Sequence, residues 1–293
     1  MKKTIIILWV SLALLPSTLF LPLVQDYLSS TGLEVAPIPA AEMRPAMEAT
    51  IQIIMFPIDS DEVERIEAGQ ERIITKCSSG LGTLVNHKGE ILLITHDHWR
   101  CLDRLGKVQF RNAAGEQLYV LDGETFKDLI RYRDGGTLIL GRSTGEDRPD
   151  YLSALVWSSR KESVRLIVPA ELGIGINAGI GETLMIVRQG RNGATSVDLI
   201  KASVESIEER WGQPAYELRS ANGENIMPGD SGGGLWLGEY FVGTMWKSWL
   251  DYQWNWESLE REQKWTEISY GAQLPENIDG IIQNSVAPVK RGK

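Results

Sequence analysis

Short apolar runs separated by turn residues recur from residue 51 to residue 245, and this spacing restricts the fold more than any other feature. Regular short runs without a long helical pattern are typical of all-β proteins. The chain has 293 residues, 43% of them hydrophobic, which suffices for one two-part domain or two small domains. Strands are expected at residues 51–56, 72–76, 80–85, 90–96, 137–140, 164–168, 182–188, 197–207, 215–219, 235–237 and 240–245.

The sequence Gly229-Asp230-Ser231-Gly232-Gly233 carries the clearest chemical signal. A nucleophilic serine needs a tight turn and amide N–H groups that converge where an oxyanion develops. Glycine can take backbone angles that other residues avoid, and it leaves room for a substrate to approach. A shorter Gly-x-Ser-x-Gly pattern fits a hairpin turn equally well, but the five-residue sequence favours a serine hydrolase.

These five residues resemble the nucleophile motif of the trypsin and chymotrypsin family of serine proteases. The resemblance covers about residues 50–275 and is closest to bacterial HtrA-type domains, but without an expected PDZ domain. It implies two six-stranded antiparallel β-barrels with the active site in the cleft between them. It also implies a histidine base and an aspartate, in that order along the chain, before Ser231.

The base can be sought among three histidines, His87, His96 and His98. His96 ends a predicted hairpin that resembles the family's segment before its catalytic histidine, so the resemblance implies His96 as the base. His98 lies two residues further, on the same side if the strand continues, and remains the alternative. His87 falls in the predicted turn at residues 86–89 and is expected to be a solvated surface residue.

The acid is expected just before an apolar strand that lies between the base and the nucleophile. Asp134 precedes the run at residues 137–140 and resembles the family's aspartate at such a position. An aspartate before glycines is also a common turn residue. Asp128 and then Asp122 remain as alternatives. The predicted triad is therefore His96, Asp134 and Ser231.

Family spacing also implies positions around the substrate. The backbone amides of Gly229 and Ser231 would form the oxyanion hole. Asn225 would lie at the floor of the primary pocket, where an amide argues against a strong preference for Lys or Arg. Trp246 and Ser248 would line its wall, where the family has a serine and a glycine.

The chain has two cysteines, Cys77 and Cys101, which flank the histidine hairpin. The family often carries a disulfide across its histidine loop, and an even count in an exported protein favours one here. A metal site is not expected, since nothing supplies further ligands. The implied chemistry needs no cofactor.

The N-terminus carries an export signal or a membrane anchor. Lys2 and Lys3 precede an apolar run at residues 5–15 and a second patch at residues 19–24. Either reading places the remaining chain outside the cytoplasm. The expected organisation is a signal peptide or anchor at 1–25, a linker at 26–48, an N-terminal barrel at 49–145, an inter-barrel linker at 146–163, a C-terminal barrel with a short terminal helix at 164–284, and a tail at 285–293.

The predicted function is that of an exported serine endopeptidase acting on proteins or peptides. An inactive peptide-binding pseudoprotease and an esterase with the same triad are the alternatives. The net charge of −9 argues against nucleic acid as a partner, and membrane contact is expected only through the N-terminal segment. Cleavage after Arg72 is not expected to activate the chain. The tryptophan-rich segment 246–265 is expected to form a hairpin that packs on its own barrel, with a membrane-facing or substrate-gripping loop as the alternative.

Overall fold

The structure, a computed structural model, describes residues 44–58, 76–142, 149–162, 167–191, 196–210, 212–221, 224–255 and 260–284. The expected export segment at 1–25, the linker up to residue 43, and Arg72 lie outside these residues. Among the helices that are described, none has the length and apolar character needed to cross a membrane.

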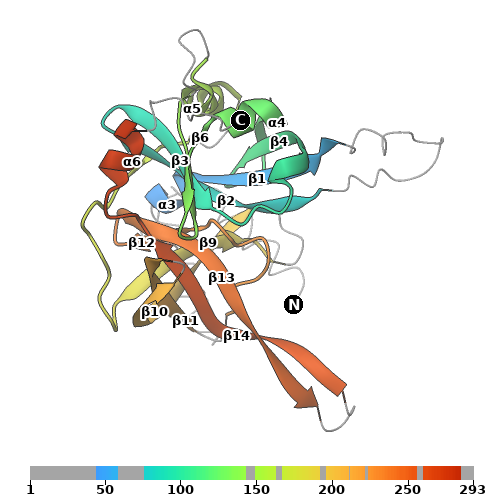
Figure 1. Cartoon of the computed structure of the whole chain (residues 1–293), viewed down its shortest axis with the longest axis vertical. Coiled ribbons are helices and arrows are strands. Elements are labelled where there is room, and N and C mark those ends of the chain that lie inside the picture. Colours follow the sequence, from blue (N-terminus) through green and yellow to red (C-terminus); the bar gives the residue numbers. More distant parts are fainter. Residues whose placement is uncertain are drawn as a thin grey trace, which may run out of the picture. The chain divides into compact units, whose positions relative to one another are not determined.

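Eight strands form one sheet, seven from the first half of the chain and β8 from the second half (Figure 1). Seven follow the order β5-β4-β1-β2-β3-β7-β6, and β8 pairs in parallel with β2. All other pairings are antiparallel. The strands are β1 (Thr50–Pro57), β2 (Ser78–His87), β3 (Glu90–His96), β4 (Leu105–Asn112), β5 (Gln117–Asp122), β6 (Ile130–Asp134), β7 (Thr137–Leu140) and β8 (Ala170–Glu171).

Six strands of the second half close into an antiparallel barrel in the order β10-β11-β14-β13-β12-β9. They are β9 (Thr183–Gln189), β10 (Val197–Arg210), β11 (Gln213–Ser220), β12 (Gly234–Leu237), β13 (Tyr240–Asn255) and β14 (Glu260–Gln273). The predicted all-β class is confirmed, and the closed barrel with a second sheet is consistent with a chymotrypsin-like double barrel. The first sheet has eight strands where six were expected.

Part of the higher strand number comes from a hairpin at Gly135 and Gly136. Both glycines have positive φ, 56° and 85°, which non-glycine residues rarely adopt. Two consecutive residues of this kind make the tight turn that joins two antiparallel strands. The single strand expected after Asp134 is therefore the second strand of the β6–β7 hairpin, and Asp134 ends the first.

Short helices flank the sheets. They are α3 (Arg44–Glu48), the 3-10 helix η3 (Leu102–Arg104), α4 (Gly123–Asp128), α5 (Tyr151–Glu162) and α6 (Ile278–Asn284). Helix α5 falls within the expected inter-barrel linker at 146–163, and its Leu152 and Leu155 are buried in the core of the first sheet. That segment therefore also contributes to packing. The terminal helix expected near residue 284 is present as α6.

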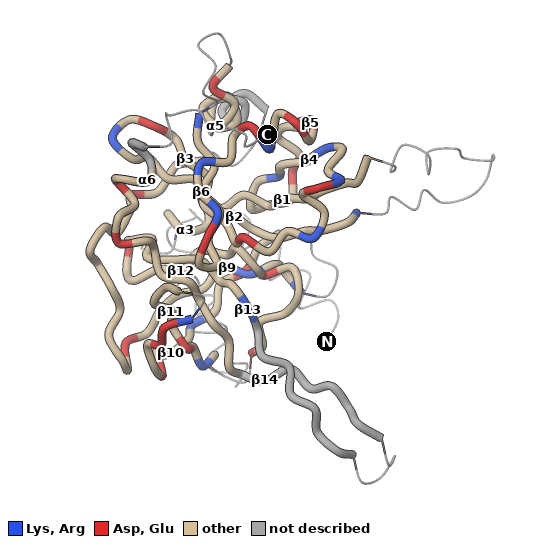
Figure 2. Tube along the Cα trace, viewed as in Figure 1, with Lys and Arg blue, Asp and Glu red and all other residues tan. Residues whose placement is uncertain are grey.

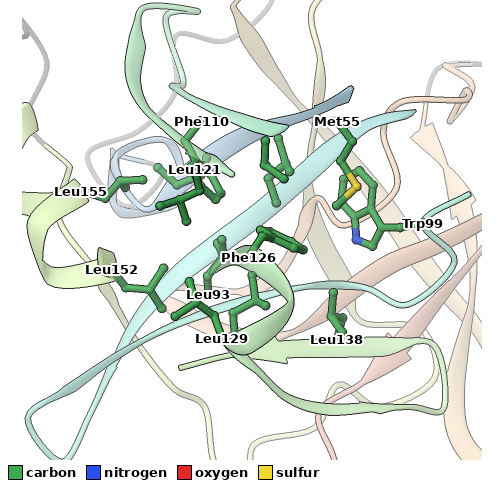
Figure 3. Packing of buried hydrophobic residues seen from close by; sticks show 14 of the residues in the cluster. Met55, Leu93, Trp99, Phe110, Leu121, Phe126, Leu129, Leu138, Leu152 and Leu155 are labelled. Carbon is green, nitrogen blue, oxygen red and sulfur yellow. The ribbon is translucent and has the colours of Figure 1, made fainter. Parts of the chain in front are cut away.

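Three apolar cores hold the fold. The first lies under one face of the first sheet, where Figure 3 shows Met55, Phe110, Phe126 and Trp99 among the buried side chains. The third fills the second barrel. The second combines residues of both sheets, including Leu81, Val85, Leu92, Ile94, Val187, Trp236 and Phe241. Strands β2 and β3 contribute to the first two cores, which explains why most of their residues are buried.

The backbone of the tryptophan-rich segment forms the expected hairpin. Strands β13 and β14 are paired as far as Asn255 and Glu260, and Figure 1 shows them continuing beyond the barrel as a two-stranded extension. From Ser248 to residue 267 the side chains lie outside the described set. The predicted packing of the tryptophans on the barrel stays a prediction.

One histidine prediction is wrong. His87 is buried, with 7% of its surface exposed, and its Nε2 lies 2.6 Å from Oδ1 of Asp279 in α6. Its turn position suggested exposure, but the returning C-terminal helix covers it. Figure 2 shows acidic and basic positions interspersed along the described trace, in keeping with a surface that carries both signs.

Candidate active site

Ser231 lies in the turn before β12, and the glycines around it are required by close contacts. Gly229 and Gly232 have φ of 102° and 82°. A Cβ on Gly232 would lie 2.0 Å from the carbonyl oxygen of Leu81 in β2. The Leu81 amide in turn donates to the Ser231 carbonyl at 2.8 Å. The serine turn of the second barrel is therefore pressed against the first sheet, as two barrels that share one site require.

His98 makes the contact that defines the site. Its Nε2 lies 3.1 Å from Oγ of Ser231, within hydrogen-bond distance. The imidazole is partly solvent-exposed, with 42% of the side chain accessible. A neutral histidine with the proton on Nδ1 can accept the serine proton at Nε2, so this pair has the geometry of a nucleophile and its base.

His96 lies beneath this pair rather than in contact with the hydroxyl. Its ring stacks on Trp99 with centroids 4.1 Å apart and lies 4.1 Å from the ring of His98. It is 2% exposed, and within the described residues neither ring nitrogen has a hydrogen-bond partner. Burial and the neighbouring His98 hold the pKa of His96 well below its usual value, against an opposing effect of Asp97. His96 is therefore a neutral packing residue in this arrangement.

The carboxylate nearest the base belongs to Asp97. Its Oδ1 lies 3.7 Å from Nδ1 of His98 and accepts a hydrogen bond from Nε1 of Trp246 at 2.9 Å. Its Oδ2 accepts from the amide of Gly136 at 3.2 Å. Burial raises the pKa of Asp97, but the interactions with His98, Trp246 and Gly136 outweigh it and lower the pKa to about 2. Asp97 is therefore ionised at neutral pH.

The predicted acid, Asp134, does not contact a histidine among the described residues. Its Oδ1 accepts from the next amide, that of Gly135, at 2.8 Å, and the residue is exposed in the β6–β7 turn. Asp122 caps α4 by accepting from Thr125. Asp128 ends the same helix, where its carbonyl accepts from Arg131. Asp134 stays a prediction, but the structure brings Asp97 to the base.

The expected substrate positions have local contacts of their own. Trp246 holds Asp97, and its ring lies edge-on to that of His98 at 5.3 Å. The carbonyl of Asn225 accepts from Arg191. Ser248 pairs with Ser269 of β14, and its side chain lies outside the described set.

The two amides expected to form the oxyanion hole are those of Gly229 and Ser231. Within the described residues neither donates to another group of the protein. Two hydrogen bonds shape the turn that carries them, from the Asp230 amide to the Met227 carbonyl and from the Gly233 amide to the Asp230 carbonyl, both at 3.0 Å. The oxyanion hole formed by these two amides stays a prediction.

Asp230, between these amides, is fully buried and ion-paired. Its carboxylate accepts from both terminal nitrogens of Arg191, and from the amides of Gln189 and Met227 at 2.9 and 2.8 Å. Arg191 also donates to the carbonyl of Asn225 at 2.9 Å. One guanidinium thereby ties the end of β9 to the whole serine turn.

The expected disulfide between Cys77 and Cys101 is present, with Cα atoms 6.1 Å apart. It joins the start of β2 to the segment that follows His98. Cys101 and Trp99 belong to the first core, so the histidine segment is anchored by packing as well as by the disulfide. Within the described residues no cluster of His, Cys, Asp and Glu is arranged to hold a metal ion.

Sequence reasoning missed two residues of this site. Asp97 stands between the two candidate histidines, and its only signal was that adjacency. Arg191 lies just after β9. The only sequence signal for it was indirect, because an aspartate buried in the serine motif would need a positively charged partner. His98 was the alternative base, and the structure places it, not His96, on the hydroxyl of Ser231.

Comparisons with known proteins give similarities in fold. No family model matches the chain, and no curated protein matches it. Similar solved structures include a mutant of Rv3671c from M. tuberculosis H37Rv in its inactive form, at 12% identity and a TM-score of 0.48, covering 87% of this chain and 98% of that one. The active form of the same protease has 13% identity, a TM-score of 0.47 and coverage of 88% and 91%. A mutant of the tobacco etch virus protease has 12% identity, a TM-score of 0.48 and coverage of 85% and 83%.

Proposed function

We propose that this chain is a serine peptidase in which Ser231 is the nucleophile and His98 is the general base. The contact of 3.1 Å between Nε2 of His98 and Oγ of Ser231 is the observation that carries the proposal. It joins an imidazole from the first sheet to a hydroxyl in a glycine-rich turn of the second barrel. A serine and a histidine in this geometry are the minimum for nucleophilic catalysis at a carbonyl.

The reaction follows from this pair. Nε2 of His98 takes the proton from Oγ of Ser231 as the oxygen bonds to the scissile carbonyl carbon. The carbonyl oxygen becomes an oxyanion, which the amides of Gly229 and Ser231 would bind. His98 then gives its proton to the departing amine, leaving an acyl-enzyme. Water, deprotonated by the same imidazole, releases the acid and restores Ser231.

His98 is preferred to the sequence-predicted base His96 for a physical reason. A base must gain a proton during the reaction, and His96 is buried without a partner for either nitrogen among the described residues. Desolvation makes its protonation costly, as its lowered pKa indicates. His98 is partly exposed and lies beside the carboxylate of Asp97, which favours the imidazolium that forms.

An oxidising compartment is the proposed location. A disulfide in the fold is typical of exported proteins, and it supports the export predicted from residues 1–25. Proteins or peptides are the proposed substrates, since the resemblance of the serine motif is to proteases.

Labelling with a fluorophosphonate probe tests the nucleophile and base together. The probe phosphonylates an activated serine Oγ and loses fluoride. We expect the parent chain to be labelled, and Ser231→Ala and His98→Gln to lose labelling by at least about 1,000-fold. His87→Gln is the matched control, because it removes a histidine far from the serine turn. It should be labelled like the parent.

Four results would contradict the proposal or a part of it. Undiminished labelling of Ser231→Ala would exclude this nucleophile. Labelling that survives in His98→Gln but not in His96→Gln would return the role of base to His96. A parent chain that binds peptides without cleaving them, and is not labelled, would identify a pseudoprotease. Cleavage of esters but of no member of a peptide library would identify an esterase.

A further inference from the structure

We infer that Asp97, the residue directly before the base, is the carboxylate that positions His98, and that Trp246 and Gly136 hold it in place. The inference rests on the proposed function, in which His98 is the base for Ser231. It assigns the orienting role to the loop that carries the base rather than to Asp134. Trp246 is then a positioning residue as well as a candidate wall of the substrate pocket.

The contacts of Asp97 form a closed arrangement. One carboxylate oxygen lies between the indole N–H of Trp246, at 2.9 Å, and Nδ1 of His98, at 3.7 Å. The other oxygen accepts from the amide of Gly136 at 3.2 Å. Two neutral N–H donors from different elements thus fix a negative charge on the Nδ1 side of the imidazole. Nε2, on the opposite side of the ring, faces Ser231.

This placement selects the tautomer that the base needs. A negative charge near Nδ1 favours a proton on that nitrogen, which leaves Nε2 unprotonated and able to accept from the serine hydroxyl. The same charge stabilises the imidazolium once the proton has moved. Other charged or titratable groups nearby are His96, whose ring is buried and neutral, and Arg133, whose Nε donates to the Asp97 carbonyl at 3.2 Å. A third is Tyr132 of β6, whose pKa is raised by burial and by the charges of Asp134 and Asp97.

Within the described residues, the β6–β7 hairpin contacts the carboxylate of Asp97 through a backbone amide, and its Arg133 side chain contacts only the Asp97 carbonyl. Gly136 faces Trp246 so closely that a Cβ on it would lie 2.5 Å from Cδ1 of the indole. Its positive φ of 85° also disfavours other residues. Asp134, two residues earlier, is turned toward the Gly135 amide. The hairpin therefore presents the Gly136 N–H, and the carboxylate comes from the histidine side.

Trp246 links this carboxylate to the nucleophile. Its indole N–H binds Asp97, its ring lies edge-on to His98 at 5.3 Å, and its carbonyl lies 3.5 Å from Oγ of Ser231. The residue therefore touches three members of the site from β13. Replacing the indole by a phenyl ring removes the donor to Asp97 while keeping an aromatic ring beside His98.

A matched pair of isosteric variants tests the inference, with kcat/KM measured from pH 4 to 9 on a peptide that the parent cleaves. Asp97→Asn removes the charge and keeps one acceptor oxygen, so that only one of the two donors, Trp246 or Gly136, retains its partner, and we expect a loss of roughly 100- to 10,000-fold. The acid limb of its pH profile should move to lower pH, because the protonated base is no longer stabilised by a nearby negative charge. Asp134→Asn should stay within about threefold of the parent. Trp246→Phe should lose about tenfold, the effect of one hydrogen bond to a charged group.

The outcomes separate this inference from the proposed function. Full activity in Asp97→Asn with a large loss in Asp134→Asn would restore Asp134 as the acid and leave Ser231 and His98 in their roles. Activity within threefold of the parent in both variants would also overturn the inference. Equal losses of activity in Asp97→Asn and Asp134→Asn without a displaced pH profile would show that Asp97 is only structural. A loss in Asp97→Asn that a lower unfolding temperature explains would show the same. Activity that survives in Ser231→Ala would instead contradict the proposed function.

Discussion

The two segments that meet at the site are held in different ways. The histidine segment, residues 96–101, is fixed by the Cys77–Cys101 disulfide, by the buried ring of Trp99 and by neutral donors to Asp97. The serine turn, residues 225–233, is fixed by a charge pair, because the fully buried Asp230 accepts from Arg191 and two backbone amides.

The difference assigns two carboxylates to different tasks. Asp97 is partly exposed and lies beside a group whose charge changes during the reaction. Asp230 is dry and paired with a cation that stays charged at all working pH values. A fixed pair suits a turn whose amides must be in place before an oxyanion forms, since preorganised donors need no rearrangement at that moment. In the proposed mechanism, the rigid serine turn suits oxyanion binding, and the partly exposed histidine segment suits proton transfer.

Removal of the Arg191 charge should have the largest effect. Arg191→Met leaves a buried carboxylate without its cation, which typically costs 3 to 5 kcal/mol, so we expect about 4 kcal/mol lower free energy of unfolding. The serine turn should also lose its fixed shape, with kcat reduced by roughly 100-fold or more, as when an oxyanion donor is lost. Denaturant unfolding and fluorophosphonate labelling measure the two effects.

A double-mutant cycle sharpens this prediction. Asp230→Asn combined with Arg191→Met removes the unpaired charge and keeps one acceptor oxygen, so that one of the amides of Gln189 and Met227, which bind different oxygens of Asp230, retains its partner. We expect the double variant to recover a large part of the lost stability. If the single and double variants unfolded alike, the charge pair would not be what holds the serine turn.

Loss of the disulfide tests the other segment. Replacing Cys77 and Cys101 together by alanine opens a loop with a sequence separation of 24 residues. Chain-entropy arguments give a loss of about 3 kcal/mol for a loop of this size. The core contacts of Trp99 remain, so folded molecules should still be labelled at Ser231. Complete loss of labelling at temperatures where the variant is folded would show that the disulfide, rather than packing, orients the base.

Gly136 tests whether the hairpin must approach Trp246 closely. Gly136→Ala adds a methyl group 2.5 Å from the indole at a φ of 85°, and we expect about 2 kcal/mol lower stability and roughly tenfold lower kcat/KM. Gly89→Ala is the matched control. Its φ is 87°, but a Cβ there would meet no atom within 4 Å. The control should lose about 1 kcal/mol and no activity. Equal activity in both variants would separate the hairpin from the positioning of Asp97.

The part of the fold that could be predicted came from strands that carry a local signal, whereas β4, β5 and β6 were not among the expected strands. The apolar runs that became β1, β2, β3 and β7 are short and bounded by turn residues, so periodicity alone placed them. The β6–β7 turn was missed because it depends on two consecutive glycines with positive φ, and the pattern of apolar residues does not reveal backbone angles. Helix α5 was missed because its apolar residues become informative only once the first core exists.

The site could be predicted where a single residue of the required type is available. It could not be predicted where several residues of that type compete for one role. The motif around Ser231 leaves little choice, since glycine alone fits the contact with Leu81. His96 and His98 differ only in where the chain bends after β3. That bend turns His96 inward onto Trp99 and His98 outward to the hydroxyl. The carboxylate depended on the same bend, and no sequence pattern could place it.

The neutral His96 beneath the base gives the smallest expected effect, a dependence of stability on pH. Its pKa is low in the folded chain, through burial and then through His98, and is about 6.5 when the chain unfolds. The unfolded state therefore takes up a proton that the folded state does not, and stability should fall as pH drops below about 6.5. One such group lowers the unfolding free energy by about 1.4 kcal/mol between pH 7.5 and 5.5. Urea unfolding of the parent and of His96→Phe at both values measures this, since the variant should lose less over the interval by that amount. Parallel losses in the two proteins would mean that His96 is protonated in the folded state, close to His98, and the contrast between a neutral packing histidine and a working base would fail.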